Sequence, residues 1–156
     1  MSFVPLALDL DGRRVLCVGG GRVGTRRATA FADAGALVRV VSPEVTDALA
    51  ADGRIEVTLR GFEVDDLDGA ELVHTATGVA DVDAAVAAAA GERRLWCIDA
   101  TNAERATAHV LVHREADGVT VAVHSHGDPR RSRAVADRIV TLLEGTEPRC
   151  MDPLSR

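Results

Sequence analysis

The sequence contains no lysine and no tyrosine, because all 18 of its basic residues are arginine and its tyrosine count is zero. Without lysine the chain has no amine for a Schiff base, no anchor for pyridoxal phosphate and no phosphate-loop lysine, and without tyrosine it has no phenolic proton donor. Any acid or base in the chain must therefore be Asp, Glu, His or Cys.

Charge and cysteine content exclude further classes of protein. The formal net charge is -6, whereas nucleic-acid-binding domains are normally strongly basic, so we expect no nucleic-acid partner. The three cysteines, Cys17, Cys97 and Cys150, are widely spaced and indicate neither a disulfide framework nor a zinc knuckle. We therefore expect a cytoplasmic protein with no resident metal. No apolar stretch approaches the length of a membrane span, so we expect no membrane partner.

Short apolar runs alternate with helical patterns over the first two thirds of the chain. The runs predict strands at 15–18, 37–41, 55–59, 70–75 and 94–98. The segments between them predict helices at 22–34, 44–51 and 79–90. Such alternation is typical of a parallel sheet covered by helices on both faces, so the predicted fold class is α/β, with a Rossmann-type sheet.

The pattern changes after Asp99. Two short β-like runs at 109–113 and 119–124 predict a hairpin, and 129–144 predicts a helix with one apolar face. We interpret 1–107 as a dinucleotide-binding domain and 108–145 as a smaller second segment. Residues 146–156 are expected to be a disordered tail.

A complete G-x-G-x-x-G motif, formed by Gly19, Gly21 and Gly24, stands between the first predicted strand and the first predicted helix. In this context the first glycine permits a tight turn, the second lets the backbone approach a pyrophosphate, and the third allows close helix packing. The motif predicts a dinucleotide site, and the alternative is a glycine-rich turn without a ligand.

Dinucleotide sites often have an acidic residue about 20 residues after the glycines, where it binds the adenosine ribose. Glu44 lies near that position and would repel a 2′-phosphate, which favours NAD over NADP. Glu44 could instead be a simple acid at a helix N-terminus. Arg22, in the glycine loop, could touch the pyrophosphate.

Four segments together resemble the precorrin-2 dehydrogenase family, which includes modules of sirohaem synthases: LDLDGRRVLCVGGGRVGTRRATAFADAGALVRVVSPEV, FEVDDLDGAELVHTATG, WCIDAT and VTVAVHSHGDP. The resemblance covers roughly residues 3 to 140. It implies NAD-dependent oxidation of precorrin-2 to sirohydrochlorin in sirohaem biosynthesis. It also implies a homodimer in which the hairpin and the following helix make much of the subunit contact.

The resemblance carries roles onto individual residues of this chain. It implies a pyrophosphate site at Gly19, Gly20, Gly21, Arg22, Val23 and Gly24. It places Pro43 and Glu44 at the adenosine ribose, Thr77 near the nicotinamide, and Ser125 in the tetrapyrrole pocket. Asp99 falls where the family has an important aspartate.

Asp99 is the candidate base, because oxidation of precorrin-2 removes a proton as well as a hydride. The residue lies at the end of a predicted parallel strand, where open α/β sheets bind ligands. A base buried beside the substrate is expected to have a raised pKa. The alternative is that Asp99 only caps the following turn.

The remaining candidates lie around the second predicted hairpin strand. His124 and His126 would share one face of a strand, where they could act as acid and base or offer two nitrogens to iron, although a solvated hairpin end explains the same spacing. Arg130, Arg131 and Arg133 could bind the eight carboxylates of the tetrapyrrole, or could form a solvated positive surface. His74, in an apolar strand, is expected to be a satisfied core histidine.

The sequence thus favours an NAD-dependent precorrin-2 dehydrogenase. Two alternatives stay open. One is sirohydrochlorin ferrochelatase activity in the same pocket, and the other is a non-catalytic dinucleotide-binding regulator.

Overall fold

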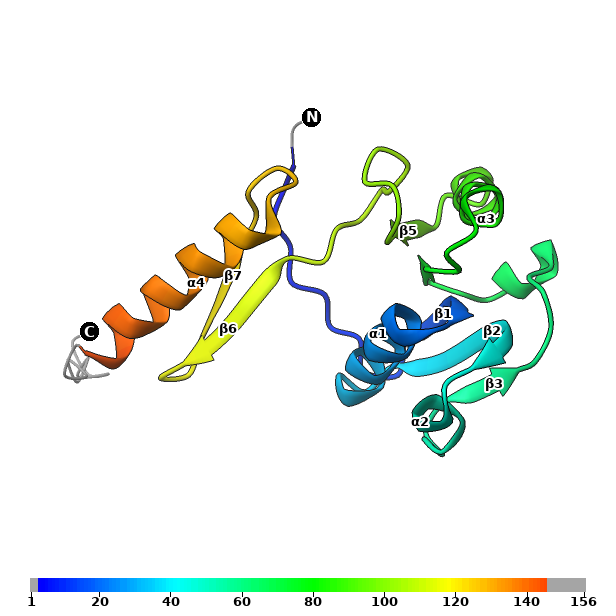
Figure 1. The fold of residues 1–156 in the computed structure, drawn as a ribbon, viewed down its shortest axis with the longest axis horizontal. Coiled ribbons are helices and arrows are strands. Elements are labelled where there is room, and N and C mark those ends of the chain that lie inside the picture. The colour runs from blue at the N-terminus through cyan, green and yellow to red at the C-terminus, as the bar shows by residue number, and fades with distance from the viewer. Residues whose placement is uncertain (1–2, 146–156) are drawn as a thin grey trace, which may run out of the picture. The chain divides into compact units, whose positions relative to one another are not determined.

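Five short strands rich in valine and leucine form a parallel sheet in the computed structural model, which describes residues 3–145 (Figure 1). The strands are β1 (Arg14–Gly20), β2 (Leu37–Val45), β3 (Glu56–Thr58), β4 (Leu72–Thr75) and β5 (Trp96–Asp99). Their spatial order is β3-β2-β1-β4-β5, and every neighbouring pair is parallel. The chain order reverses direction between β1 and β4, which is the point where open α/β sheets bind ligands. The predicted Rossmann-type fold class is confirmed.

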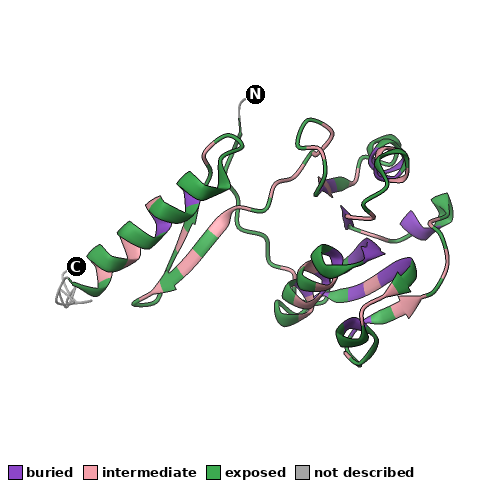
Figure 2. Ribbon diagram, in the orientation of Figure 1, coloured by how far each residue is buried: buried purple, intermediate pink, exposed green. Residues whose placement is uncertain are grey.

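Helices cover the two faces of this sheet and bury a separate apolar cluster on each. Alternate residues of β1 point to opposite faces, because strand side chains have a period of two. On one face Cys17 packs with residues of α1 (Arg22–Asp33) and α2 (Asp47–Ala50). On the other, Leu16 and Val18 pack with α3 (Ala80–Glu92). The central strands are therefore buried on both sides (Figure 2).

A second unit, Val110–Arg156, follows the first unit, Met1–His109. It contains the antiparallel hairpin β6 (Val112–Ala116) and β7 (Val119–Val123), followed by α4 (Pro129–Glu144). The core of this unit is small: Ser132 and Ala136 are its only buried residues within the part that the structure describes. Most apolar side chains of the unit are therefore partly exposed.

The first strand of the hairpin starts and ends three residues later than predicted. The first strand covers 112–116 rather than 109–113, so that Arg114 to Ala116 are paired rather than part of a five-residue link. Asp117 and Gly118 form the turn with φ values of +50° and +72°. Two successive residues with positive φ make the tight two-residue turn that matches strand twist. The predicted tail, 146–156, lies outside the described residues.

The segment after Val41 also differs from its prediction. We expected β2 to end at Val41 and a helix to start at Glu44, but β2 continues to Val45 and α2 begins at Asp47. The register explains the extension, because Val18 pairs with Val41 while Gly20 pairs with Val45, so β2 bulges past β1. Thr46 then caps α2, its side chain accepting from the Leu49 amide.

Two further features complete the description. A 3-10 helix, η1 (Val64–Leu67), precedes β4 and was not predicted. Over residues 3–145, no helix is both long enough and apolar enough to cross a bilayer.

Candidate functional site

The three motif glycines of the turn between β1 and α1 differ in how much space surrounds them. Gly19 has a φ of +106°, and a Cβ there would lie 2.4 Å from the carbonyl oxygen of Ala76. A Cβ on Gly24 would lie 1.9 Å from the carbonyl oxygen of Gly19. Gly21 differs, since a Cβ there would meet nothing within 4 Å. The first and third glycines thus serve the packing of the turn, while the second faces open space.

The N-terminus of α1 opens beside this space. Gly21 is the N-cap, and the Thr25 amide donates to its carbonyl at 2.8 Å. The amides of Arg22, Val23 and Gly24 precede that first helical bond, and the first turn carries no acidic residue. Amides at a helix N-terminus suit an anion, so the cradle fits the pyrophosphate of a dinucleotide.

The residues predicted at the adenosine ribose lie on the bulged end of β2. Pro43 and Glu44 are both exposed. The Ser42 hydroxyl donates to the Glu44 carbonyl at 2.7 Å and holds this backbone. A Cβ on Gly20 would lie 2.7 Å from the same carbonyl oxygen, so the glycine turn packs directly against the Glu44 backbone. Glu44 is therefore close to the turn, but on a strand rather than in a helical turn.

The end of β4 continues the same edge of the sheet. Val18 pairs with Thr75, and Thr75 with Asp99, so the carboxyl ends of β1, β4 and β5 are level. Neighbouring strands are about 4.8 Å apart, which places Asp99 roughly 10 Å from the glycine turn. Thr77, predicted near the nicotinamide, follows β4 in this row.

Asp83 is a buried carboxylate that organises this edge and was missed in the sequence. One of its oxygens accepts from the Thr75 hydroxyl at 2.5 Å, the Thr77 amide at 3.0 Å and the Thr77 hydroxyl at 2.9 Å. Its other oxygen lies 3.2 Å from the Thr101 hydroxyl. The signal was present, because Asp83 lies on the same helical stripe as Val86 and Ala90, both of which face the sheet.

Asp99 is buried and hydrogen-bonded at both carboxylate oxygens. Oδ1 accepts from the Thr101 amide at 2.8 Å, the Thr101 hydroxyl at 2.7 Å and the Asn102 amide at 2.9 Å. Oδ2 accepts from the Arg105 Nε at 2.8 Å. The turn-capping interpretation of Asp99 therefore describes a real set of contacts. Arg105 was not singled out in the sequence.

The expectation of a raised pKa at Asp99 is wrong for the free protein. Burial raises the pKa of this carboxyl, but the hydrogen bonds from Thr101, Asn102 and Arg105 together lower it further, and the pKa lies below the ordinary 3.8. Each of these donors favours the ionised form of the carboxyl. Asp99 is held as a carboxylate rather than poised to take a proton.

His74 lies in β4 beneath α1. It was expected to be a core histidine with its hydrogen bonds satisfied, and only the burial is correct. The ring is 1% exposed and lies edge-on to Phe31, with centroids 6.2 Å apart. Among the described residues, however, His74 Nδ1 is a buried polar atom without a hydrogen-bond partner. Burial and the nearby Arg27 lower the pKa of His74 to about 4, against smaller opposite effects of Asp83 and Asp99. The imidazole is neutral at physiological pH.

The second unit holds the remaining predicted site residues. β7 ends at Val123, and His126 has a φ of +47°, so His124 and His126 do not share a strand face as expected. The chain turns here because Ser125 and Asp128 bond to each other before α4, the Ser125 hydroxyl donating to the Asp128 carbonyl. The two imidazole rings nevertheless lie 5.0 Å apart between centroids.

Ser125 and the three predicted arginines belong to the start of α4. The hydroxyls of Ser125 and Ser132 are 2.6 Å apart. Arg130, Arg131 and Arg133 are exposed in the first turns of the helix. The structure brings these residues together within the second unit, while the glycine turn, Thr77 and Asp99 gather within the first.

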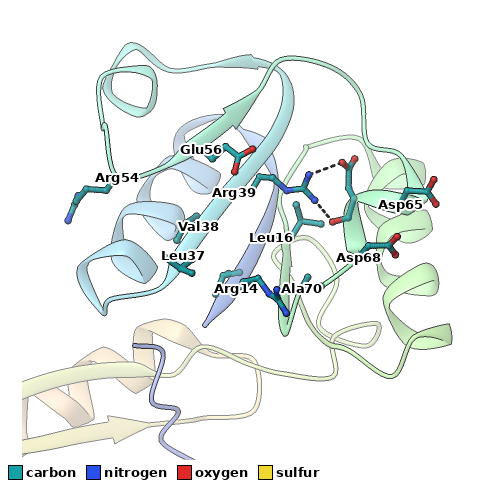
Figure 3. Close-up of a pocket in the computed structure, with 13 residues that line it drawn as sticks. Arg14, Leu16, Leu37, Val38, Arg39, Arg54, Glu56, Asp65, Asp68 and Ala70 are labelled. Atoms are coloured by element: carbon teal, nitrogen blue, oxygen red, sulfur yellow. Dashed lines mark hydrogen bonds and ion pairs between the residues drawn. The ribbon is translucent and has the colours of Figure 1, made fainter. Parts of the chain in front are cut away.

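A cavity of about 570 Å³ lies at the opposite edge of the sheet (Figure 3). Its lining includes Arg14 and Leu37, the first residues of β1 and β2. Two of its arginines are already paired: Arg39 donates to the Asp66 carbonyl at 2.5 Å, and Arg54 lies 2.8 Å from Asp33. Since ligands of open α/β sheets bind at the carboxyl ends of strands, this cavity is not the candidate site.

Comparison with known proteins agrees with the geometry of the glycine turn. A family described as putative NAD(P)-binding matches residues 6–112. The chain belongs to this family. The predicted nicotinamide dinucleotide cofactor is thereby confirmed.

Similar proteins include siroheme synthases of Pseudomonas. That of Pseudomonas putida (strain W619) is 36% identical over 153 residues, which are 94% of this chain and 32% of the relative. That of Pseudomonas entomophila (strain L48) is 47% identical over 98 residues, 61% of this chain and 21% of the relative. The chain thus spans at most about a third of the length of these relatives.

A solved structure titled SirC, precorrin-2 dehydrogenase, has the same fold. Its TM-score is 0.77 at 23% identity, covering 90% of this chain and 71% of that one. This likeness agrees with the predicted Rossmann-type sheet followed by a hairpin and a helix.

Proposed function

We propose that this chain oxidises precorrin-2 to sirohydrochlorin with NAD. The observation that carries the proposal is the row of groups along one edge of the sheet, where the glycine turn, Thr77 and Asp99 lie at the ends of β1, β4 and β5. The likeness to siroheme synthases and to the fold of a precorrin-2 dehydrogenase supports this substrate.

Along that edge, different residues of the first unit have different roles in this proposal. Gly19 to Gly24 bind the pyrophosphate through backbone amides, and Pro43 with Glu44 lies at the adenosine ribose. When bound, NAD supplies the acceptor for the hydride that precorrin-2 loses. Thr77 borders the nicotinamide, and Asp99 takes the proton that the substrate loses in the same oxidation.

Residues of the second unit bind the substrate in this proposal. His124, Ser125 and His126 bind the tetrapyrrole, and Arg130, Arg131 and Arg133 bind its carboxylates as bidentate partners. These arginines support the proposal because they are exposed and gathered at one end of α4.

The protein acts as a cytoplasmic homodimer in this proposal. Support comes from the small core of the second unit, since a two-stranded hairpin with one helix buries little apolar surface by itself. A second copy packed on this unit would cover the partly exposed side chains.

Turnover of anaerobically prepared precorrin-2 with NAD tests the proposed function, followed by the spectra of NADH and sirohydrochlorin. The wild type should turn over, and Asp99→Asn should lose most of its kcat while binding NAD normally. Asp81→Asn, an exposed acid on the same edge, is the matched control and should keep wild-type rates. NAD binding by the wild type without turnover would reject the dehydrogenase and favour the non-catalytic regulator.

A further inference from the structure

Arg105 covers the carboxylate that the proposed reaction requires. The Asp99 side chain is 0% exposed, whereas the Arg105 side chain lying on it is 30% exposed. Arg105 Nε donates to Asp99 Oδ2 at 2.8 Å, and its Nη2 donates to the Thr101 hydroxyl at 3.2 Å. Oδ2 therefore faces a guanidinium, which accepts no hydrogen bond and stays protonated at physiological pH.

A base covered in this way must lose a donor before it can take a proton. The donors to Oδ1 are two backbone amides and a hydroxyl of the turn that Asp99 itself caps, so they are fixed by the turn. Arg105 is the donor that can leave, because it holds Oδ2 by a partly exposed side chain. Departure of Arg105 alone would free Oδ2 and leave the turn intact.

We propose that Arg105 is a positioning residue for Asp99, which it releases by moving its guanidinium onto a carboxylate of the substrate. The inference rests on the proposed function, since precorrin-2 brings eight carboxylates to this edge. Guanidinium and carboxylate form strong bidentate pairs, so the ion pair with Asp99 is exchanged for one of equal kind. Asp99 Oδ2 then accepts the proton that the substrate loses, while the hydride passes to NAD.

The charges around Asp99 favour proton uptake once Arg105 has moved. Arg105 is the cation in contact with the carboxylate, and Asp83 of α3 reaches it through the shared Thr101 hydroxyl. The other titratable neighbours are His74 of β4, which is neutral at pH 7, and the buried Cys97 of β5, whose pKa is raised to about 11 by burial and by these two carboxylates. Two carboxylates then share a site without a cation, which raises the proton affinity of one of them.

The Thr101 hydroxyl can form a hydrogen bond whether Asp99 is ionised or protonated, because it has one proton to donate and two carboxylates beside it. It lies 2.7 Å from Asp99 and 3.2 Å from Asp83. When Asp99 is ionised the hydroxyl donates to it, and when Asp99 is protonated the hydroxyl can turn to Asp83. No covalent bond changes in this step.

Carbon-13 NMR of the aspartate carboxyls measures the exchange directly in the full chain. Asp99→Asn assigns the Asp99 signal, and uroporphyrin, a stable tetrapyrrole with eight carboxylates, serves as the probe. In the wild type we expect uroporphyrin to raise the pKa of Asp99 by about 1–3 pH units. In Arg105→Gln we expect a pKa already raised by a similar amount before uroporphyrin is added, and little further change. Arg93→Gln is the matched control and should behave as the wild type, because Arg93 is the C-cap of α3 and pairs with Asp68 at 3.6 Å rather than with Asp99.

Kinetics give a second readout, because a merely structural role would not move the pH profile. Arg105→Gln should raise the KM for precorrin-2, lower kcat/KM about 10- to 100-fold, and shift the acid limb of kcat to match the NMR titration. Arg105→Lys keeps the positive charge but lacks the planar guanidinium. Its kcat/KM should therefore lie between that of the wild type and that of Arg105→Gln. This variant also keeps the test valid if Arg105→Gln fails to fold.

Two results would overturn the inference: a wild-type pKa of Asp99 that uroporphyrin leaves unchanged, or an Arg105→Gln titration identical to that of the wild type. Failure of the proposed function is distinguishable from this. A wild type that shows the uroporphyrin-dependent rise but does not oxidise precorrin-2 would support the exchange and reject the dehydrogenase.

Discussion

At the scale of single residues, Gly21 and Gly24 are glycines for opposite reasons. Gly24 packs against the Gly19 carbonyl, whereas Gly21 borders open space at the N-terminus of α1. We therefore expect Gly24 to be needed for folding and Gly21 to be needed for dinucleotide binding. Alanine at each position separates the two needs.

Gly24→Ala should lower the free energy of unfolding by about 1–3 kcal/mol, because the added methyl cannot fit in the packed turn. Gly21→Ala should leave unfolding within about 0.5 kcal/mol of the wild type and weaken NAD binding about tenfold or more, a loss of roughly 1.4 kcal/mol. Urea denaturation and calorimetric titration with NAD measure both. Gly53→Ala, in an open turn, controls for alanine substitution in general. Equal loss of stability in the two motif variants would contradict the assignment.

His74 should make the stability of the protein depend on pH. Its folded pKa of about 4 lies below the ordinary 6.5, so between these values the unfolded chain binds more protons and stability falls as the pH is lowered. His74→Leu removes this cost and should gain about 2 kcal/mol more at pH 5 than at pH 7. Urea denaturation at both values measures it, with His113→Leu on exposed β6 as the control. An equal change at both pH values would show that His74 is not buried as a neutral ring.

The motif glycines of the turn could be predicted from the sequence. Two side chains near Asp99, those of Asp83 and Arg105, were missed. The positions of the motif glycines follow from spacing alone, because all three lie within one local strand-to-helix turn. Asp83 and Arg105 contact Asp99 or its turn only after α3 and the loop beyond β5 have folded. The expected rise in the pKa of Asp99 failed because the donors of the following turn, foreseen only in the alternative interpretation, act together with Arg105, which was not foreseen.

At the scale of elements, the helices with strong local signals were predicted best. α4 was predicted at 129–144 and begins and ends there, because Asp128 and Pro129 define its start. β2 was predicted four residues too short, because its extension depends on pairing with Gly20 of β1. The hairpin shifted because Asp117 and Gly118 favour a turn tighter than the expected link.

The N-cap of α4 gives a test at this scale. The Asp128 carboxylate accepts from the Arg130 and Arg131 amides, both at 3.0 Å. Asp128→Ala should therefore cost about 0.5–2 kcal/mol, seen by hydrogen exchange as faster opening of α4. Asp128→Ser retains a capping oxygen and should recover most of the loss. Unchanged protection of α4 in Asp128→Ala would contradict the capping role.

At the scale of the whole molecule, the two units differ in how much they bury. The first unit has an apolar cluster on each face of its sheet, while the second buries only Ser132 and Ala136 among its described residues. In the proposed homodimer, the partner subunit would bury apolar side chains of the second unit only.

Dilution should therefore loosen the second unit first. Because subunit association stabilises folded protein by mass action, amide protection over 112–144 should fall as the protein is diluted through the dissociation range. Protection over 14–99 should stay constant. Hydrogen exchange with mass spectrometry at several concentrations measures both segments in one experiment. Protection of 112–144 that is independent of concentration, in a protein monomeric by ultracentrifugation, would contradict the homodimer.

The most direct test of the central claim is the stoichiometry of a single anaerobic turnover. With protein in excess over precorrin-2 and with NAD present, we predict one NADH formed for each sirohydrochlorin, at the same rate, and strong loss of both in Asp99→Asn. Sirohydrochlorin formed without NADH, or full rates in Asp99→Asn, would contradict the assignment of this edge of the sheet as a dehydrogenase site.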